Sequence, residues 1–192
     1  MKVAIIGKGN VGTAIAKGLN EKHEVKFGHR DKKEPVAEAA SWGEIIVIAV
    51  PYGAVGDVAK ELGSAADGKV VLDVTNAISA SGELATGFST SGAEELQKEL
   101  PKANVVKAFN TVFAANQSTG KVGKETLTLF VAGDQAKAKR TVMQLGKDIG
   151  FEPVDAGPLK AARYLEPMAM LMINIGYDLG MGTCIGYRLA TC

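Results

Sequence analysis

The fold is decided by Val3-Ala4-Ile5-Ile6-Gly7-Lys8-Gly9-Asn10-Val11-Gly12, near the start of the chain. The first four of these residues are apolar without alternation, which is typical of a strand buried on both faces of a parallel sheet. A glycine-rich turn follows, and the residues after the turn have helical spacing. Because a strand buried on both faces needs helices on both sides, this stretch predicts an α/β fold with a doubly wound, mainly parallel sheet.

Each glycine of the turn has a separate role in a dinucleotide site. Gly7 allows a tight turn after the strand, Gly9 lets the backbone approach a pyrophosphate, and Gly12 lets the helix lie close to the strand. Asn10 is expected to cap the helix, so that free N–H groups of its first turn face the phosphates. The turn therefore predicts a Rossmann-type site, and a glycine-rich turn in another α/β protein is the alternative. The expected cofactor contacts here are Gly7, Lys8, Gly9, Asn10, Val11 and Gly12.

The bulk composition limits the number of domains and the kinds of partner. With 192 residues, the chain is long enough for one full domain with a small appendage. Its net charge of +1 gives no field that would attract nucleic acid or an anionic membrane. The chain begins directly with a strand, and its most apolar late stretch, residues 168–173, is too short to span a bilayer. We therefore expect a cytoplasmic protein that contacts neither nucleic acid nor membrane.

The cysteines and histidines do not have the pattern of a metal or redox site. Cys184 and Cys192 lie near the C-terminus without a neighbouring histidine, so reduced thiols are expected. The chain has two histidines, His23 and His29, which disfavours a histidine-based metal site or a Ser-His-Asp triad. We therefore expect no metal, name no catalytic side chain, and assign the chemistry to a bound cofactor.

The end of the second expected strand, residues 24–27, predicts which dinucleotide binds. In related folds an Asp or Glu at this end bonds the ribose hydroxyls of NAD and repels a 2′-phosphate. This sequence has instead His29 and Arg30, with Lys33 close behind. A charge-assisted hydrogen bond from Arg30 is worth about 1.5–3 kcal/mol, or roughly tenfold to hundredfold preference for NADP. His29 and Lys33 are further expected contacts, although both could equally belong to a solvated turn.

Three more strand ends are expected at the same edge of the sheet as the glycine turn. Their strands are predicted at residues 44–50, 70–72 and 105–108. Ligands of open α/β sheets bind at the carboxyl ends of the strands. The residues expected to border the cofactor there are Val50, Pro51, Tyr52, Thr75, Asn76, Ala77, Asn110 and Thr111. Their uncharged donors and acceptors suit a carboxamide or the edge of a flavin-like ring, whereas Tyr52 could equally be a surface aromatic.

The other segments complete the α/β pattern. Helices are expected at residues 54–62 and from Ser91, where Ser91 and Glu94 form a capping box, to Pro101. A strand at residues 126–132 and a helix capped by Asp134 should follow. Residues 79–91 are rich in Ser, Gly and Thr and predict a mobile loop, either a lid over the site or a plain linker.

An apolar stripe begins after residue 159, with a possible kink at Pro167. It consists of Ala161, Leu165, Met168, Met172, Ile175 and Leu179. Such a stripe is typical of a core or of a subunit interface. The methionines of this region could instead line a pocket for a planar ring, because thioethers adapt to irregular space.

The chain resembles the archaeal and bacterial reductases that pass hydride between NADP and the deazaflavin coenzyme F-420. The resemblance covers nearly the whole chain and includes the opening strand with its glycine turn, Gly28 with Arg30, Val50-Pro51 and Gly87-Phe88. Its most specific features are Ala132-Gly133-Asp134, Asp155-Ala156-Gly157-Pro158-Leu159, Arg163, Glu166, Asn174-Ile175 and Gly180-Met181-Gly182.

The resemblance implies a two-part organisation and a reaction. Residues 1–155 would form an NADP-binding Rossmann domain, and residues 156–192 a C-terminal helical lobe, often paired as a homodimer with the deazaflavin in the cleft. Hydride would pass directly between nicotinamide and deazaflavin, so catalysis would be mainly positioning.

Two departures from the family pattern concern the second substrate. This chain has residues 73–77 where the family has a proline-rich segment, and Asn110 where the family has a histidine. Both segments border the space beside the nicotinamide, so NADP binding is expected and the acceptor stays open. A flavin or a ferric chelate, as in the similar module of membrane ferric reductases, is the alternative small-molecule acceptor. A non-catalytic NADPH-binding redox sensor is the rival of another class.

Overall fold

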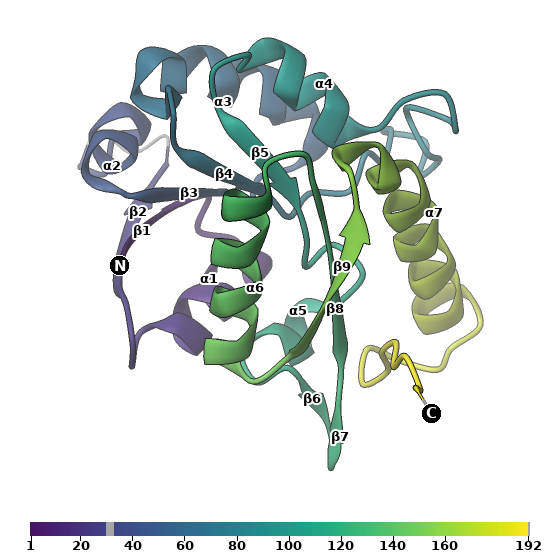
Figure 1. Cartoon of the computed structure of the whole chain (residues 1–192). Coiled ribbons are helices and arrows are strands. Elements are labelled where there is room, and N and C mark those ends of the chain that lie inside the picture. Colours follow the sequence, from purple (N-terminus) through teal and green to yellow (C-terminus); the bar gives the residue numbers. More distant parts are fainter. Residues whose placement is uncertain (30–32, 192) are drawn as a thin grey trace.

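The computed structural model covers the whole chain, and the structure describes residues 1–29 and 33–191. Its centre is a seven-stranded sheet with the order β2-β1-β3-β4-β5-β8-β9 (Figure 1). The strands are β1 (Lys2–Ile6), β2 (Glu24–Gly28), β3 (Ile45–Ile48), β4 (Val70–Asp73), β5 (Asn104–Lys107), β8 (Thr128–Gly133) and β9 (Glu152–Gly157). β1 to β5 are parallel, whereas β8 is antiparallel to β5 and parallel to β9. The predicted doubly wound, mainly parallel sheet is confirmed.

Helices cover both faces of this sheet (Figure 1). One face is covered by α1 (Asn10–Leu19) and α6 (Ala136–Ile149), and α5 (Ala114–Gln117) packs against α1. The other is covered by α2 (Val36–Trp42), α3 (Val55–Leu62) and α4 (Gly92–Glu99). α7 (Ala162–Ile173) packs against α4, and a short hairpin of β6 (Lys121–Val122) and β7 (Glu125–Thr126) projects below the sheet.

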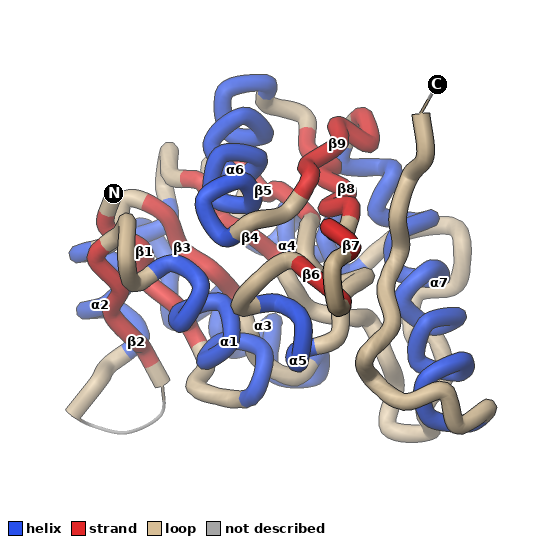
Figure 2. Tube along the Cα trace, turned by 90° about the horizontal axis from the view of Figure 1, so that it is seen from below, coloured by secondary structure: helices blue, strands red, loops and turns tan. Residues whose placement is uncertain are grey.

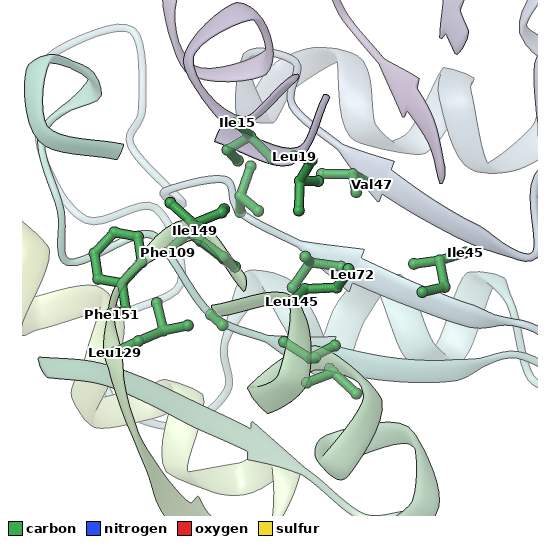
Figure 3. Close-up of a cluster of buried hydrophobic side chains, with 14 of the residues drawn as sticks. Ile15, Leu19, Ile45, Val47, Leu72, Phe109, Leu129, Leu145, Ile149 and Phe151 are labelled. Carbon is green, nitrogen blue, oxygen red and sulfur yellow. The ribbon is translucent and has the colours of Figure 1, made fainter. Parts of the chain in front are cut away.

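The strand β1 shows why both helical layers are needed. Val3 and Ile5 pack in the cluster on the α1 and α6 face, whereas Ala4 and Ile6 pack in the cluster on the α2 and α3 face. Figure 3 shows the first cluster, in which the rings of Phe109 and Phe151 meet edge to face. A continuous apolar run is therefore the pattern of a strand with no solvent face.

Two predicted helix caps are wrong. Gly9, in an extended conformation, caps α1, and its carbonyl accepts the Thr13 N–H at 2.9 Å, so Asn10 is already the first helical residue. Gln135 precedes α6, and the Asp134 carboxylate instead accepts the Leu159 N–H at 2.9 Å. Asp134 thus supports the turn before α7, where a backbone donor needs a partner.

The apolar stripe predicted after residue 159 is buried only in its first part. Leu165 and Met172 are buried, but Leu179 is 70% exposed. The reason is that α7 widens into a π turn, Asn174–Asp178, which changes the angular register of the residues after it. The segment that follows turns back beside α7 (Figure 2), and the Tyr187 carbonyl accepts the Thr128 N–H at 2.9 Å. Among the described residues, no helix is long and apolar enough to cross a membrane.

The packing of α6 on β8 can be tested with one substitution at two helical positions. A Cβ on Gly146 of α6 would lie 2.4 Å from Leu129 Cδ2, whereas a Cβ on Gly56 of α3 would meet nothing within 4 Å. We expect Gly146→Ala to lower the free energy of unfolding by about 1–3 kcal/mol through overpacking. Gly56→Ala should raise it by about 0.5–1 kcal/mol, because alanine favours the helix. Urea unfolding measures both, and equal effects would contradict the close contact.

Candidate functional site

The glycine turn between β1 and α1 has the geometry that the sequence predicts. Gly7 has a φ of +109°, and a Cβ there would lie 2.2 Å from the Ala49 carbonyl oxygen. A Cβ on Gly12 would lie 2.2 Å from the Gly7 carbonyl oxygen, whereas a Cβ on Gly9 would meet nothing within 4 Å. The protein's own packing therefore requires Gly7 and Gly12, and Gly9 leaves open space beside the turn.

The amino-terminal end of α1 borders this open space. The first helical hydrogen bond is the one from the Thr13 N–H to Gly9, so the N–H groups of Asn10, Val11 and Gly12 have no intrahelical acceptor. The first turn of α1 carries no acidic residue. These donors and the positive end of the helix dipole suit a phosphate group.

Two adjoining cavities extend from the turn along the carboxyl edge of the sheet. The first, of about 400 Å³, lies toward β2, and the second, of about 290 Å³, lies toward β4. The predicted contacts that line the first cavity are Gly7, Lys8, His29, Val50 and Pro51. Those that line the second are Gly9, Asn10, Val11, Val50, Pro51, Tyr52, Thr75 and Asn76. The structure thus brings most of the predicted contacts to one edge.

The remaining predicted contacts do not line these cavities. Gly12 is buried within α1, and Ala77, Asn110 and Thr111 are buried behind the ends of β4 and β5. Lys33 is outside the residues that line either cavity. Arg30 lies outside the residues that the structure describes.

Lys8 and His29 converge on the Glu34 carboxylate, which the sequence analysis missed. Lys8 Nζ lies 3.1 Å from Glu34 Oε2, and His29 Nε2 lies 2.5 Å from the same oxygen. The hydrogen bond from Lys8 is the largest cause of the lowered pKa of Glu34. The spacing of the turn gave no signal for this residue. Lys8 and His29, which both line the first cavity, therefore contact the same negatively charged group.

Asn76 and Asn110 join the ends of β4 and β5. Asn110 Nδ2 donates to Asn76 Oδ1 at 3.1 Å and to the Leu165 carbonyl of α7 at 2.9 Å. These two acceptors fix which end of the Asn110 amide carries the nitrogen. Asn110 Oδ1 is then a buried acceptor without a partner among the described residues. Such an atom costs about 1–3 kcal/mol, which a ligand N–H could recover.

The backbone before Asn110 is in a rare conformation. Phe109 has a φ of 66°, in the left-handed region that residues other than glycine seldom adopt. The buried Gln117 side chain holds this turn, because its Nε2 donates to the Phe109 carbonyl at 3.2 Å and to the Val112 carbonyl at 2.9 Å. Strain of this kind is typical of functional sites, where the surrounding contacts maintain it.

A buried ion cluster lies directly behind the asparagines, and the sequence analysis missed it. Lys107 Nζ lies 2.9 Å from Asp73 Oδ2, 3.0 Å from Glu166 Oε1 and 2.7 Å from the Thr75 carbonyl oxygen. Burial lowers the pKa of Lys107, but the two carboxylates raise it by more, so the ammonium stays protonated. Glu166 Oε2 also accepts the Gly92 N–H, at the start of α4, at 3.0 Å. The cluster therefore joins β4, β5, α4 and α7.

A second ion pair, which is partly buried, joins α4 to α7. The Arg163 guanidinium donates to both oxygens of Glu94, each at 2.8 Å. These bonds lower the pKa of Glu94 and raise that of Arg163. Ser91 Oγ accepts the Glu94 N–H at 3.2 Å, as the capping box predicts, but the Glu94 carboxylate turns to Arg163 instead of the Ser91 N–H.

Tyr52, which lines the second cavity, donates its phenolic hydrogen to Glu95 of α4. Burial and then the Glu95 carboxylate raise the pKa of the phenol, so Tyr52 stays protonated. It is therefore a partly buried, hydrogen-bonded residue of the site wall and not a freely exposed aromatic.

A third cavity, of about 520 Å³, lies on the other side of the glycine turn, between α1, α5 and the C-terminal segment. Phe113 and Tyr177, whose rings meet edge to face at 5.4 Å, contribute its aromatic wall. Lys8 and Lys17 contribute its charges, and its lining among the described residues includes no acid. This cavity therefore suits an aromatic or anionic group.

Comparisons with known proteins identify relatives of this chain. Residues 2–77 match the family described as NADP oxidoreductase, coenzyme F420-dependent. The chain is 30% identical over 189 residues to metalloreductase STEAP3 of Rattus norvegicus, across 90% of this chain and 37% of that protein. It is 27% identical to the F420-dependent NADP reductase of Methanocaldococcus jannaschii, across 91% of this chain and 92% of that protein.

The fold is also found in a solved structure. The crystal structure of a candidate F420-dependent NADP-reductase from Arthrobacter sp. FB24 matches with a TM-score of 0.93, at 27% identity, over 100% of both chains. The resemblance that the sequence predicts is therefore confirmed. The chain spans 37% of the length of STEAP3. It spans nearly the whole length of the two reductases.

The different surroundings of Gly9 and Gly12 give a matched pair of alanine substitutions. Gly9→Ala should leave thermal unfolding unchanged and weaken NADPH binding about tenfold or more, since its methyl group enters the open space that a phosphate needs. Gly12→Ala should lower the free energy of unfolding by about 1–3 kcal/mol, because its Cβ meets backbone. Thermal unfolding and calorimetry measure the two effects. Wild-type NADPH affinity in Gly9→Ala would contradict the assignment.

Proposed function

We propose that this chain, an NADP-dependent oxidoreductase by its relatives and its fold, transfers hydride between NADPH and a deazaflavin of the coenzyme F-420 type. The observation that carries the proposal is the glycine turn with an open helix end, flanked by two adjoining cavities. This arrangement has room for the two ends of a dinucleotide on either side of its pyrophosphate.

The adenosine end of NADP would occupy the first cavity. Its 2′-phosphate would take the anion position near Lys8 and His29, where the Glu34 carboxylate now lies. Arg30 and Lys33, which follow β2 in the sequence, would add their charges. The pyrophosphate would accept hydrogen bonds from the first N–H groups of α1.

The nicotinamide end would occupy the second cavity, beside the two asparagines. Its carboxamide N–H would donate to Asn110 Oδ1, a buried acceptor that lacks a partner among the described residues; because Asn76 and not Asn110 lines the cavity, this bond requires the Asn76 side chain to shift. Asn76, which lines that cavity and bonds to Asn110, would hold the other side of the same group. The polar but uncharged residues at this end suit an amide better than an ion.

The acceptor would enter from the third cavity, next to the glycine turn. A planar ring can pack on the aromatic pair Phe113 and Tyr177, and an anionic tail can pair with Lys17. A deazaflavin with a charged tail has both features, and so does a phosphorylated flavin. A ferric chelate, the other candidate acceptor, shares only the charge.

The chain's own residues would contribute mainly by positioning. Bound NADPH supplies the hydride, and the overall reduction of a deazaflavin also takes up a proton from solvent. The described site offers Tyr52 as a protonated phenol bonded to Glu95 and Lys107 as an enclosed ammonium, so we assign no side chain as a general acid. Holding two rings in contact suffices for a hydride step.

The proposed assembly is a homodimer in the cytoplasm. The homodimer is supported by a group of exposed apolar side chains on α7 and the segment after it, namely Tyr164, Leu171, Tyr177, Leu179 and Met181. A second copy of the chain would cover such a surface. We also propose a division into a nucleotide domain, residues 1–155, and a C-terminal lobe, residues 156–192, because α7 and the segment after it follow β9, the last strand of the sheet.

The role of Arg30 is tested by its alanine variant. Arg30→Ala should raise KM for NADPH about tenfold to hundredfold and leave KM for NADH unchanged, because only NADPH carries the 2′-phosphate. Arg140→Ala, on the exposed side of α6, is the matched control and should change neither value. Equal effects of Arg30→Ala on both cofactors would refute the phosphate contact.

The acceptor is tested with a panel of compounds. The pure protein is mixed with NADPH and, separately, coenzyme F-420, FMN, riboflavin and ferric citrate, and loss of NADPH absorbance is followed. We expect fastest turnover with F-420, and a KM for FMN about tenfold below that for riboflavin because only FMN carries a phosphate. Fastest turnover with ferric citrate would favour the metalloreductase alternative. Tight NADPH binding without oxidation by any acceptor would favour a redox sensor.

A further inference from the structure

We propose that Lys107, with Asp73 and Glu166, is a positioning residue for the nicotinamide end of the cofactor. The inference rests on the proposed function, because it takes the nicotinamide to lie beside Asn76 and Asn110. Lys107 would not touch the cofactor but would hold the strand ends that do.

The first step is the backbone that leads to Asn76. The Thr75 carbonyl accepts from Lys107 Nζ at 2.7 Å, and the Thr75 N–H donates to Asp73 Oδ1 at 2.9 Å. Asp73 Oδ2 in turn lies 2.9 Å from Lys107 Nζ. Both polar groups of the Thr75 backbone are therefore bound within one closed ring of contacts, which fixes the direction in which the chain enters Asn76.

The second step is the connection to α7. The Leu165 carbonyl accepts from Asn110 Nδ2 at 2.9 Å, and the next residue, Glu166, places Oε1 3.0 Å from Lys107 Nζ. Adjacent residues of one helix thus hold the Asn110 side chain and the ammonium group. A shift of α7 would move both contacts together, so the position of α7 and the geometry of the asparagine pair depend on each other.

The third step is the burial of the cluster. Lys107 is 0% exposed, and Asp73 and Glu166 are each 1% exposed. A charge without access to water needs an opposite charge in contact, so each member constrains the positions of the others. The cluster has two carboxylates for one ammonium group and therefore one excess negative charge. This charge is stabilised at the start of α4, where Glu166 accepts the Gly92 and Ala93 N–H groups at 3.0 and 3.4 Å. The removal of one charge should therefore loosen the ends of β4 and β5.

The partly buried pair Arg163 and Glu94 provides the comparison that separates positioning from general stability. It joins the same two helices with two hydrogen bonds of 2.8 Å. No hydrogen bond of Arg163 or Glu94 among the described residues reaches the ends of β4 or β5. A variant of this pair should weaken the contact between α4 and α7 without disturbing the asparagines.

The test compares Glu166→Gln with Glu94→Gln in the whole chain. Calorimetry gives the affinities for NADPH and for 2′,5′-ADP, which carries only the adenosine end, and the fluorescence lifetime of bound NADPH reports how firmly the nicotinamide is held. For Glu166→Gln we expect unchanged affinity for 2′,5′-ADP, about tenfold weaker binding of NADPH, and a shorter lifetime. Glu94→Gln should match the wild type in all three.

The proposal is overturned if Glu166→Gln weakens both ligands by the same factor or changes neither, or if Glu94→Gln reproduces its pattern. Should Glu166→Gln fail to fold, Asp73→Asn is judged by the same criteria, because it keeps an acceptor for the Thr75 N–H and removes a charge. A wild-type protein that binds neither ligand would refute the proposed function and this inference with it. A wild type that binds both, with a uniform variant effect, would refute the inference alone.

Discussion

The arrangement of the site depends on the buried contacts of the Lys107 ammonium group with Asp73 and Glu166. Isolated in the interior, a charge would cost several kcal/mol, and it is tolerated here because Asp73, Glu166 and the Thr75 carbonyl all contact it. Those partners come from β4, from the segment after it and from α7. The requirement to neutralise one strand residue therefore brings the C-terminal helix against the carboxyl edge of the sheet, where the predicted cofactor contacts gather.

A second constraint acts on the loop that follows β5. The backbone of Phe109 is left-handed where the chain turns, with its carbonyl accepting the Val112 N–H, while the ring of Phe109 stays in the core against Phe151. Gln117 supplies both of its amide hydrogens to carbonyls of this loop, so the strained turn is held from within. As a result, Asn110 enters the site already oriented, with its nitrogen bound by protein and its oxygen left for another donor.

The sequence predicts well those features that depend on neighbours along the chain. The apolar run from Val3 to Ile6 and the spacing of Gly7, Gly9 and Gly12 each carry their own steric reason, and the structure has the turn as predicted. The buried cluster could not be predicted in this way, because Lys107 pairs with residues 34 positions before it and 59 positions after it. A lysine at the end of an apolar strand was the available signal. Glu34 was missed for a similar reason, since its partners Lys8 and His29 meet only in the folded turn.

The charged groups of the site gather at its β2 end, which suits phosphate binding, and the β4 and β5 end suits the proposed hydride transfer. The β2 end carries side chains that converge on an anion, whereas the β4 and β5 end offers amides and a protonated phenol, with the nearby charges enclosed and paired. A reaction that moved protons between side chains would need a group whose pKa lies near the working pH. Burial and the Glu95 carboxylate raise the pKa of Tyr52, and the carboxylates around Lys107 raise that of its ammonium, so both keep their protons. In the proposed reaction the site would therefore control distance and orientation, which is the contribution that direct transfer between two rings requires.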